Sequence, residues 1–399
     1  MLDIGREEIE AVARVIESKR LFRYGDPKTG YLSECDKFER ELARKTGTEY
    51  ALVVTSGTGA LICGLAGMGV GPGDEVILPG YTFMASALAP LAIGAIPVIA
   101  DVDESLTLSS KDVEAKITRR TKVIMPVHMC GLPANMNAIM RVARKHKVKV
   151  IEDACQADGG SYKGRRLGSI GDVGAFSFNY YKNITSGEGG AIVTSDRVAY
   201  ERAVIHHDGG ALFRAHAKEL GIPIFAAWNF RMNEIQGAVL RVQLKRIDGL
   251  LKQTRARKRK MVKELTGVPG LKHIRYNDLE GDCGTTVGFL FPSEAKMRAF
   301  TAALAEQKVW ASSPIDSGRH VYSNWEPVME KRGSYHRGLD AFRRPENKGS
   351  KMMNYRKDMC PRTLDILSRT VFLSITPQET MAHVRRRIEA CKKAAAAIT

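Results

Sequence analysis

The sequence has no apolar run long enough to cross a membrane. Its longest apolar stretches, such as residues 85–100, "ASALAPLAIGAIPVIA", are interrupted by proline and glycine, and they fall short of the roughly 20 residues that a spanning helix needs. Residues 1–20 carry acidic side chains early and lack a continuous apolar core, so we expect no signal peptide. We therefore expect no membrane partner.

The sequence also lacks paired cysteine motifs. Its seven cysteines are scattered, with no CxxC pair. An odd number at such spacing favours reduced thiols in a cytoplasmic protein over a disulfide framework. The "HHD" at residues 206–208 has no further ligand cluster spaced to complete a metal site, so we expect hydrogen-bonded histidines in a loop and no metal.

Acidic residues are too few to balance the basic ones: 44 Asp and Glu stand against 61 Lys and Arg, a formal charge of +17. Such an excess fits nucleic acid, an acidic membrane surface or anionic small molecules. Because there is no zinc finger, RNA-binding signature or polybasic tail, we favour an anionic cofactor and substrate over nucleic acid. The basic run at residues 252–265, "KQTRARKRKMVKEL", is more typical of the solvated face of a helix than of a nucleic-acid contact.

What is present is a regular alternation of short apolar runs and amphipathic segments, which begins near residue 50 after two stretches of helical spacing at residues 6–18 and 34–45. This alternation predicts an α/β fold with right-handed crossovers and a mainly parallel sheet flanked by helices. The expected strands lie in "YALVVTSG", "DEVILPG", "AIPVIADV", "KVIMPVHMCG", "VKVIEDACQ", "GAFSFN" and "GAIVTSD".

The pattern changes in the last third of the chain, and 399 residues are too many for one small core. We therefore assign residues 1–260 to a large domain and residues 261–399 to a smaller C-terminal α+β domain. The expected elements are a long helix from near Asn233 toward 265, a strand in 285–292, and helices at 294–307 and 378–397.

Residues 331–362 stand apart, because they hold ten Lys or Arg against three acids and show little periodicity. Two interpretations remain open for this segment. It is either a solvated loop or a basic cover over an anionic substrate, since long loops in compact domains are often functional.

Three expected strand ends carry unusual residues. In "VVTSGTGAL", residues 53–61, a strand meets a helix through small residues, and free amides at such a junction favour phosphate, although any tight turn looks similar. Asp153 closes an apolar strand, where a carboxylate needs a positive partner unless it simply caps a helix. Lys182 in "NYYKNITSGEGG" is either an ordinary solvated charge or, if desolvated, a nucleophile toward carbonyls.

One cofactor requires all three features together. Pyridoxal phosphate needs a phosphate cradle, a lysine for its Schiff base and a carboxylate against its pyridine nitrogen. Phe83 follows another expected strand and is placed to stack on the ring, or simply to pack in the core. Ser177 precedes the lysine by five residues and is placed to bind the phosphate, or simply to bond the backbone. The combination predicts a pyridoxal phosphate site.

The chain resembles the DegT/StrS family of sugar aminotransferases over nearly its whole length, and most densely from about residue 1 to 260. The resemblance implies a fold type I aminotransferase, usually a homodimer with its sites at the subunit interface. The motifs that carry it are "VVTSGTGAL", "GDEVILPGYTF", "VIMPVHMCG", "VIEDACQA", "FSFNYYKNITSGEGGAIVTSD" and "WNFRMNEIQGAVLRVQLKRID".

The resemblance also implies roles for individual residues. Lys182 would be the Schiff-base lysine and the base that moves the proton, Asp153 would pair with the pyridine nitrogen, and Gln156 would lie over the ring region. Phe83 would take the stacking position. The phosphate would be bound by Thr58, Gly59 and Ser177, with Asn229 reaching in from the neighbouring subunit.

Relatives in which histidine replaces the lysine are dehydratases, so Lys182 implies transamination, with glutamate or glutamine as the amino donor. Residues 320–371 look like members that aminate C8 of an oxidised 3-deoxy-octulosonate to give 8-amino-3,8-dideoxy-D-manno-octulosonate, a lipopolysaccharide sugar. Two alternatives stay open. One is a nucleotide-linked keto-hexose aminotransferase, and the other is a pyridoxal phosphate-binding regulatory protein without turnover.

Overall fold

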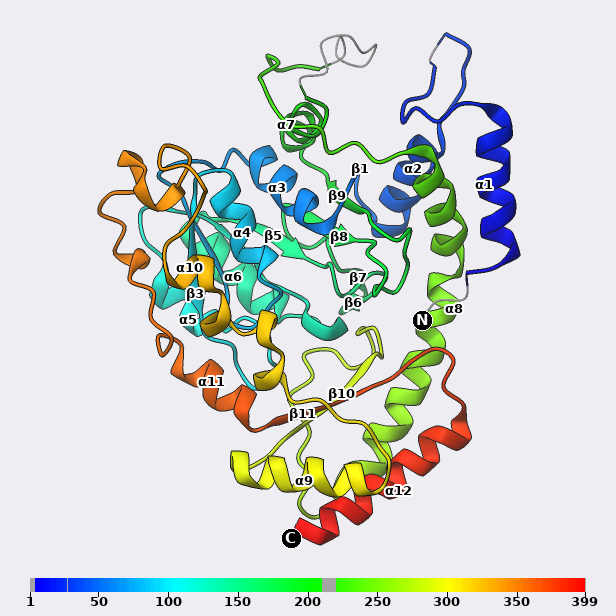
Figure 1. Cartoon of the computed structure of the whole chain (residues 1–399), viewed down its shortest axis with the longest axis vertical. Coiled ribbons are helices and arrows are strands. Elements are labelled where there is room, and N and C mark those ends of the chain that lie inside the picture. Colours follow the sequence, from blue (N-terminus) through cyan, green and yellow to red (C-terminus); the bar gives the residue numbers. More distant parts are fainter. Residues whose placement is uncertain (1–3, 27, 210–219, 399) are drawn as a thin grey trace.

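A seven-stranded sheet lies at the centre of the computed structural model, which describes residues 4–26, 28–209 and 220–398 (Figure 1). The strand order is β1-β9-β8-β5-β4-β2-β3. Neighbours are parallel from β8 to β3, whereas β9 is antiparallel to both β1 and β8. The predicted α/β class with a mainly parallel sheet is confirmed. The strands are β1 (Tyr50–Val54), β2 (Glu75–Pro79), β3 (Ile96–Ala100), β4 (Thr121–Ile124), β5 (Lys149–Asp153), β8 (Val173–Ser177) and β9 (Gly190–Thr194).

Helices cover both faces of this sheet, which explains why its strands are apolar on both sides. Along β2, Ile77 packs into the cluster under one face, while Val76 and Leu78 pack under the other. The first face is covered by α2 (Glu34–Thr46), α5 (Ser110–Lys116), α6 (Met136–His146) and the start of α8 (Glu234–Leu265). The second is covered by α3 (Gly57–Gly67), α4 (Ala85–Ala92) and α7 (Arg197–His207).

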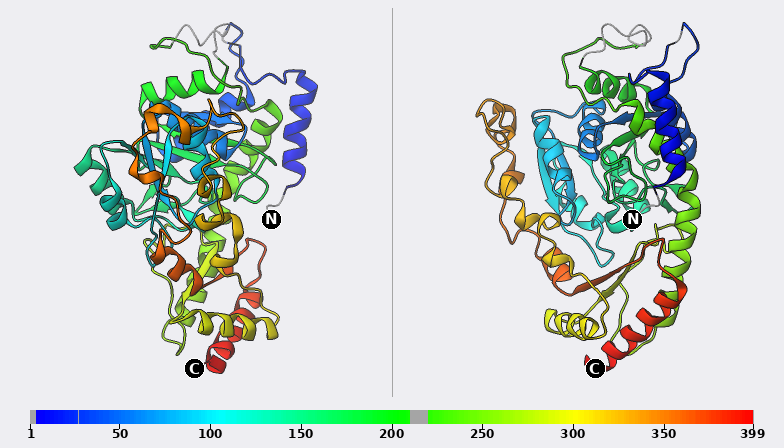
Figure 2. Two further views of the ribbon diagram at one scale, coloured as in Figure 1. Left: turned by 60° about the vertical axis from the view of Figure 1, so that its left-hand side comes forward. Right: turned by 45° about the vertical axis from the view of Figure 1, so that its right-hand side comes forward.

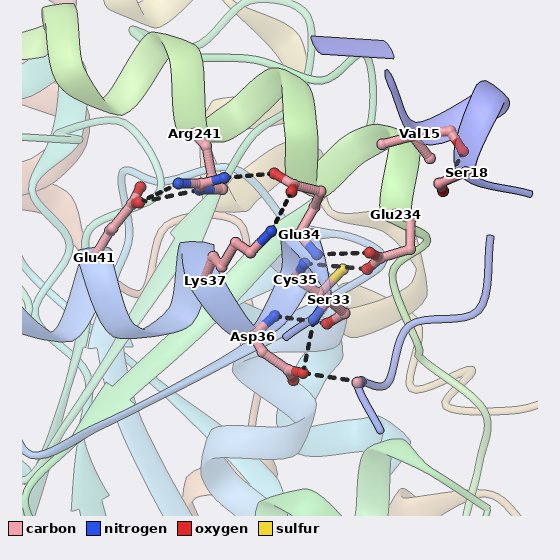
Figure 3. Close-up of polar contacts among 11 residues, drawn as sticks. Val15, Ser18, Ser33, Glu34, Cys35, Asp36, Lys37, Glu41, Glu234 and Arg241 are labelled. Carbon is pink, nitrogen blue, oxygen red and sulfur yellow. Dashed lines mark hydrogen bonds and ion pairs between the residues drawn. The ribbon is translucent and has the colours of Figure 1, made fainter. Parts of the chain in front are cut away.

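The long helix α8 is tied to the N-terminal helices by charged side chains (Figure 3). Glu234, at its first turn, accepts hydrogen bonds from the amides of Glu34 (2.6 Å) and Cys35 (3.1 Å), which are the free N–H groups at the start of α2. Arg241 lies between Glu34 (2.6 Å) and Glu41 (2.7 Å). Helix α1 (Arg6–Ser18) packs against α8 from outside. These contacts fix the chain just before α8, which borders the site described below.

The C-terminal part is built around the far end of α8, and Figure 1 shows α9 and α12 beside it. Its own hydrophobic cluster joins Met261 and Leu265 of α8 to Phe289, Phe300 and Ile388. The strand and helices predicted here are present, while the domain division at residue 260 stays a prediction. The elements are β10 (Thr286–Leu290), α9 (Glu294–Glu306), α10 (Glu326–Met329), α11 (Pro361–Ser368), β11 (Thr370–Ser374), which pairs antiparallel with β10, and α12 (Met381–Ile398).

Part of the C-terminal segment returns to the large sheet. Tyr322, Trp325 and Cys360 are fully buried in the same hydrophobic cluster as α3 and α4, whereas Phe289 and Phe300 belong to the separate C-terminal cluster. Figures 1 and 2 show the orange segment that follows α10 running along the outside of the molecule next to β3 and α4.

The middle of the basic segment 331–362 lies along edge strand β3. The side-chain amide of Asn347 donates to the carbonyl of Gly94 (2.9 Å), and the Ser350 hydroxyl donates to Glu75 (2.6 Å). Gly94 and Glu75 are at the amino ends of β3 and β2, at the opposite edge of the sheet from Asp153. Neutral side chains thus anchor residues 347–350 at the protected edge strand, away from Asp153, and the role of the segment as a substrate cover stays a prediction.

Two smaller expectations also need correction. In the basic run 252–265, Arg255 donates to the carbonyl of Gly281 (2.9 Å), and Lys258 is buried against Asp282, so the run is not simply a solvated helix face. His206 and His207 lie in the last turn of α7 and not in a loop.

Among the described residues, no helix is long and apolar enough to cross a membrane, and no group of three metal-ligating side chains occurs. All seven cysteines are free thiols.

Candidate active site

The residues singled out by their place at strand ends gather at one edge of the sheet. Asp153 and Ser177 are the last residues of β5 and β8, and Lys182 follows in the loop that leads to β9. Strand β1 points the same way as β8, because β9 is antiparallel to both. The first turn of α3 therefore opens at the same edge, as expected for a ligand site at the carboxyl ends of parallel strands.

Asp153 is a buried carboxylate with two fixed donors. Its Oδ2 accepts a hydrogen bond from the Ser86 hydroxyl (2.7 Å), and its Oδ1 accepts one from the amide of Cys155 (3.2 Å). Only 4% of the residue is exposed. Ser86 is in turn hydrogen-bonded to the hydroxyl of Thr82 (2.8 Å). A carboxylate held this firmly keeps its orientation, as a residue that must face a single ring nitrogen requires.

The first turn of α3 and the end of β8 form a narrow cradle. Ser56 caps α3 by accepting from the amide of Gly59 (3.0 Å). Within the described residues, no hydrogen bond uses the amides of Gly57 and Thr58 or the Thr58 hydroxyl. A Cβ atom added to Gly57 would lie 2.7 Å from Cβ of Ser177, so the serine side chain borders these amides. Free amides at a helix start, with a hydroxyl beside them, fit a phosphate group.

Lys182 lies between this cradle and the loop after β5. The side chain of the next residue, Asn183, donates to the carbonyl of Asp158 (3.1 Å), which joins the two loops. The positive charge of Lys182 lowers the pKa values of the Cys130 and Cys155 thiols, although burial raises both overall. The amine therefore lies close to both sulfurs. The sequence left open whether Lys182 is a solvated charge or a desolvated nucleophile. In the single chain the residue is half-buried, so its amine is only partly desolvated.

Gln156 and Phe83 border the same space. The carboxamide oxygen of Gln156 accepts from the amide of Cys130 (3.0 Å), which leaves its NH2 group as a donor. Phe83 is 39% exposed, and its ring centroid lies 5.7 Å from that of His320. Burial and the positive charges of Lys182 and Arg319 lower the pKa of His320, so this ring is near the lysine as well.

Asn229 is exposed on the segment that leads into α8. Its side-chain oxygen accepts from the amide of Arg231 (3.1 Å), and the carbonyl of the neighbouring Phe230 accepts from the amide of Thr55 (3.0 Å). This segment therefore lies next to the start of α3. Its expected role in a neighbouring subunit stays a prediction.

Four further residues at the site were not identified from the sequence: Ser86, Cys130, Asp158 and His320. Ser86 lies three residues after Phe83, at the start of α4, and this short spacing could have identified it from the sequence. His320 gave none, because it reaches the site only where its carbonyl accepts from the amide of Thr82 (3.0 Å), far away in the sequence.

The neighbouring pair of His128 and Glu152 is structural. Nδ1 of His128 accepts from the amide of Ala134 (3.1 Å), so its Nε2 carries the proton and donates to Glu152 (3.0 Å). Glu152 also accepts from the amides of Gly168 (3.0 Å) and Gly171 (2.7 Å). Both side chains are completely buried, and their hydrogen bonds are satisfied within the chain. They hold the loop before β8 in place beneath Asp153.

Taken together, these contacts fit pyridoxal phosphate. The cradle of Thr58, Gly59 and Ser177 would hold the phosphate, Asp153 the ring nitrogen and Lys182 the aldehyde carbon. Gly57 supports this assignment, because any larger residue would fill the space beside Ser177 and Cys155.

The cradle can be tested at Gly57. In Gly57→Ala, the new methyl group would lie 2.7 Å from Cβ of Ser177 and 3.0 Å from the sulfur of Cys155, so these side chains must shift. We expect the dissociation constant of pyridoxal phosphate, titrated into the cofactor-free protein, to rise about tenfold to a hundredfold, which corresponds to roughly 1–3 kcal/mol. Gly71→Ala is the matched control, since no atom lies within 4 Å of its added Cβ. Equal affinity in both variants would place the phosphate elsewhere.

Comparison with known protein families agrees with this geometry. The DegT/DnrJ/EryC1/StrS aminotransferase family matches residues 2–328. The chain is 40% identical over 244 residues to 3-amino-5-hydroxybenzoate synthase of Amycolatopsis mediterranei, which covers 60% of this chain and 61% of that protein. It is 38% identical over 273 residues to dTDP-3-amino-3,4,6-trideoxy-alpha-D-glucose transaminase of Streptomyces venezuelae, which covers 67% and 68%. The aligned region thus spans less than two thirds of the first of these relatives.

Solved structures match over nearly the full length. The crystal structure of 3-amino-5-hydroxybenzoic acid synthase aligns with a TM-score of 0.77 at 30% identity, over 99% of this chain and 97% of that one. The structure of DesV from S. venezuelae, in complex with a ketimine intermediate, aligns with a TM-score of 0.77 at 30% identity, over 98% and 94%. These alignments confirm the predicted fold type I architecture.

Proposed function

The chain belongs to the DegT/DnrJ/EryC1/StrS aminotransferase family, whose cofactor is pyridoxal phosphate, and on this basis we propose that it is a sugar aminotransferase. The amino donor is glutamate or glutamine, and the acceptor is a keto- or aldehydo-sugar. The observation that carries the proposal is the convergence of Lys182, Asp153 and the start of α3 at one edge of the sheet.

The side chains at this edge divide the work of transamination. When bound, pyridoxal phosphate supplies an electron sink for the electron pair released at the donor's α-carbon. Asp153, fixed by Ser86 and the Cys155 amide, keeps a positive charge at the ring nitrogen favourable. Lys182 removes the α-proton as a general base and later returns a proton to the acceptor. The first turn of α3 holds the phosphate, so the cofactor stays in place when the lysine releases it.

For the acceptor we propose the acidic sugar 8-oxo-3-deoxy-octulosonate, which would place the enzyme in lipopolysaccharide sugar synthesis. Arg319 supports a carboxylate substrate. It is exposed, adjoins His320, which faces Phe83, and no ion pair among the described residues uses its guanidinium. Its charge lowers the pKa of His320, so the cation lies close to that ring. The overall charge of +17 agrees with an anionic substrate.

The second candidate is a nucleotide-linked keto-hexose. It is favoured by relatives named as acting on dTDP-, GDP- and UDP-linked sugars, among them the GDP-perosamine synthase of Caulobacter vibrioides, 42% identical over 214 residues. A regulatory protein that binds the cofactor without turnover is a third candidate. The presence of both Lys182 and Asp153 argues against it, because a sensor needs no proton transfer.

A panel of acceptors separates these candidates. The purified holoprotein is incubated with glutamate or glutamine labelled with ¹⁵N at the transferable group, and with either 8-oxo-3-deoxy-octulosonate, its neutral analogue without the carboxylate, or nucleotide-linked keto-hexoses. We expect label in the amino sugar derived from the octulosonate and little in that from the neutral analogue. Label only in the nucleotide sugars would replace our acceptor with the second candidate. A bound cofactor with no transfer to any acceptor would leave the regulatory protein.

We further propose that the enzyme is a cytoplasmic homodimer with shared sites. Large apolar side chains are exposed near the cofactor site, including Tyr181 (86%) and Phe83 (39%), and a second chain would cover them. Asn229 would then approach the partner's phosphate cradle. The seven free cysteines of the chain support the cytoplasmic location, because free thiols suit a reducing compartment. Light scattering on the purified protein should give the mass of two chains, and full turnover by a monomer would contradict the shared site.

A further inference from the structure

Asp158 is a buried carboxylate that the reaction described above does not use. Only 2% of the residue is exposed. Neither of its carboxylate oxygens has a hydrogen-bond partner among the described residues. Burying such a group without a partner costs free energy, unless the group is protonated or a charge lies nearby. An orphaned carboxyl group in this position therefore requires a physical reason.

The position of Asp158 is fixed from two sides. Its carbonyl accepts a hydrogen bond from the side chain of Asn183 (3.1 Å), the residue that follows Lys182. On the other side, a Cβ on the adjacent Gly159 would lie 2.7 Å from Ile247 and 2.9 Å from Leu251, so this loop packs directly on α8. Asp158 thus cannot turn away into solvent, and it stays beside the loop that carries Lys182.

Lys182 supplies the charge near Asp158. Burial raises the pKa of Asp158 well above its usual range, and the positive charge of Lys182 opposes that rise. The two groups do not form a direct ion pair, since none joins them within 4.0 Å. Asp153 is assigned a different task in the proposed site, because its oxygens, held by Ser86 and the Cys155 amide, are those that would face the ring nitrogen.

The charged groups nearest to these two residues are Asp153, which is assigned to the ring nitrogen, and Lys45 and Arg166, which line a cavity with Asp158 but are each paired with Asp248. The thiols and the imidazole around them are neutral near pH 7. Burial raises the pKa of Cys130 to about 11 and that of Cys283 to about 12, and it places that of Cys155 well above the ordinary value. The pKa of His320 is lowered. These neutral groups are Cys130 in the turn after β4, Cys155 after β5, Cys283 before β10, and His320.

From this arrangement we propose that Asp158 is a positioning residue for Lys182, whose carboxylate acts as the counter-charge of the lysine ammonium inside the site. The inference rests on the proposed aminotransferase function for its meaning. When Lys182 takes the α-proton, the C–H bond breaks, an N–H bond forms at Nζ, and the electron pair of the broken bond goes to the electron sink that the bound cofactor would supply. The ammonium group formed in this way then faces the carboxylate of Asp158, which has no other partner among the described residues of the site. Asp158 thereby favours the state that delivers the proton to the acceptor.

The counter-charge can be measured without turnover. The full chain is freed of cofactor and shown to be folded by circular dichroism. It is then labelled briefly with acetic anhydride at pH values between about 6 and 11, the range in which lysines lose their proton. Mass spectrometry follows the acetylation of Lys182. In Asp158→Asn we expect the midpoint of Lys182 labelling to fall by about 1 pH unit or more, because an ammonium loses an opposite charge. Asp158→Glu should restore most of the difference.

The matched control is Glu188→Gln. Glu188 follows Lys182 in the same loop but is exposed, with its carboxylate bound to the side chain of Asn179 (2.8 Å). Its removal should leave the midpoint unchanged, because solvent screens its charge. A midpoint in Asp158→Asn that is unchanged or higher overturns the proposal, as does an equal shift in Glu188→Gln. Because labelling needs neither cofactor nor sugar, a failed aminotransferase assay leaves this result standing, and the two proposals fail separately.

In the active holoenzyme, the same variant should move the acidic limb of the pH–rate profile to lower pH by a similar amount. A purely structural role for Asp158 would instead lower the rate at every pH and leave the limb in place.

Discussion

Lys182→Ala should abolish transamination, lowering kcat/KM by at least about 10⁴-fold, because the variant loses both the covalent attachment point and the proton-transferring base. The purified variant should also lack the visible absorbance of a lysine-bound cofactor. It should still bind pyridoxal phosphate, since the amides of α3 and Ser177 remain. Amine transfer from labelled glutamate, recorded together with the absorption spectrum, checks both expectations.

The control is Lys252→Ala, which removes an exposed lysine of α8 and should change neither measurement. A Lys182→Ala protein that keeps the absorbance and the turnover would assign the covalent role to another amine. Loss of turnover together with a lower melting temperature would indicate misfolding. That outcome is not expected, because Lys182 is half-buried in a loop and makes no side-chain hydrogen bond within the described chain.

Asp153→Asn should lower kcat by about 10²–10³-fold while leaving the protein folded. The amide has nearly the same shape as the carboxylate, but it carries no negative charge to stabilise a protonated ring nitrogen. Steady-state rates and circular dichroism, measured on the same preparation, check this prediction.

Ser86→Ala gives a graded comparison. It removes one of the two donors to Asp153 and leaves the charge, so we expect a smaller loss of about tenfold, the effect of roughly one hydrogen bond to a charged group. If Asp153→Asn kept full activity, the carboxylate would have no part in the chemistry. A loss in Ser86→Ala as large as that in Asp153→Asn would mean that the orientation of the carboxylate matters more than its charge.

Much of the site was predictable because its central residues adjoin strand ends. Asp153 closes β5, Ser177 closes β8, and Thr58 opens the helix after β1, so a parallel sheet brings them to one edge. A strand end is a local feature that apolar runs reveal. The resemblance to a family then gave these positions their separate roles, which spacing alone left open.

The remaining residues depend on contacts that no local pattern reveals. His320 joins the site through one backbone hydrogen bond to Thr82. No local pattern marks Asp158, and its burial depends on α8 and Asn183, which come later in the chain. Whether a carboxylate is exposed or enclosed is decided by such packing, so the sequence could not distinguish Asp158 from a solvated charge.

The basic segment shows that composition does not predict where a segment docks. Its composition drew attention to ten cations, whereas its position is set by a few neutral side chains. Asn347, Ser350 and Tyr355 bond to the backbone of Gly94, the carboxylate of Glu75 and the backbone of Pro97. Because exposed charges are stable in many places, they say little about where a segment docks.

Strand β9 has a consequence for how the protein is made. Among the described strands β1 pairs only with β9, where Tyr50 lies opposite Thr194, and its one further bridge joins Val54 to Arg231, which comes later still in the chain. A ribosome that adds about 5–20 residues per second leaves β1 without its partner for on the order of ten seconds. During that interval the edge of an apolar strand is open to other nascent chains. Chaperone binding during translation, and aggregation of fragments that stop before residue 190, would follow from this single late pairing.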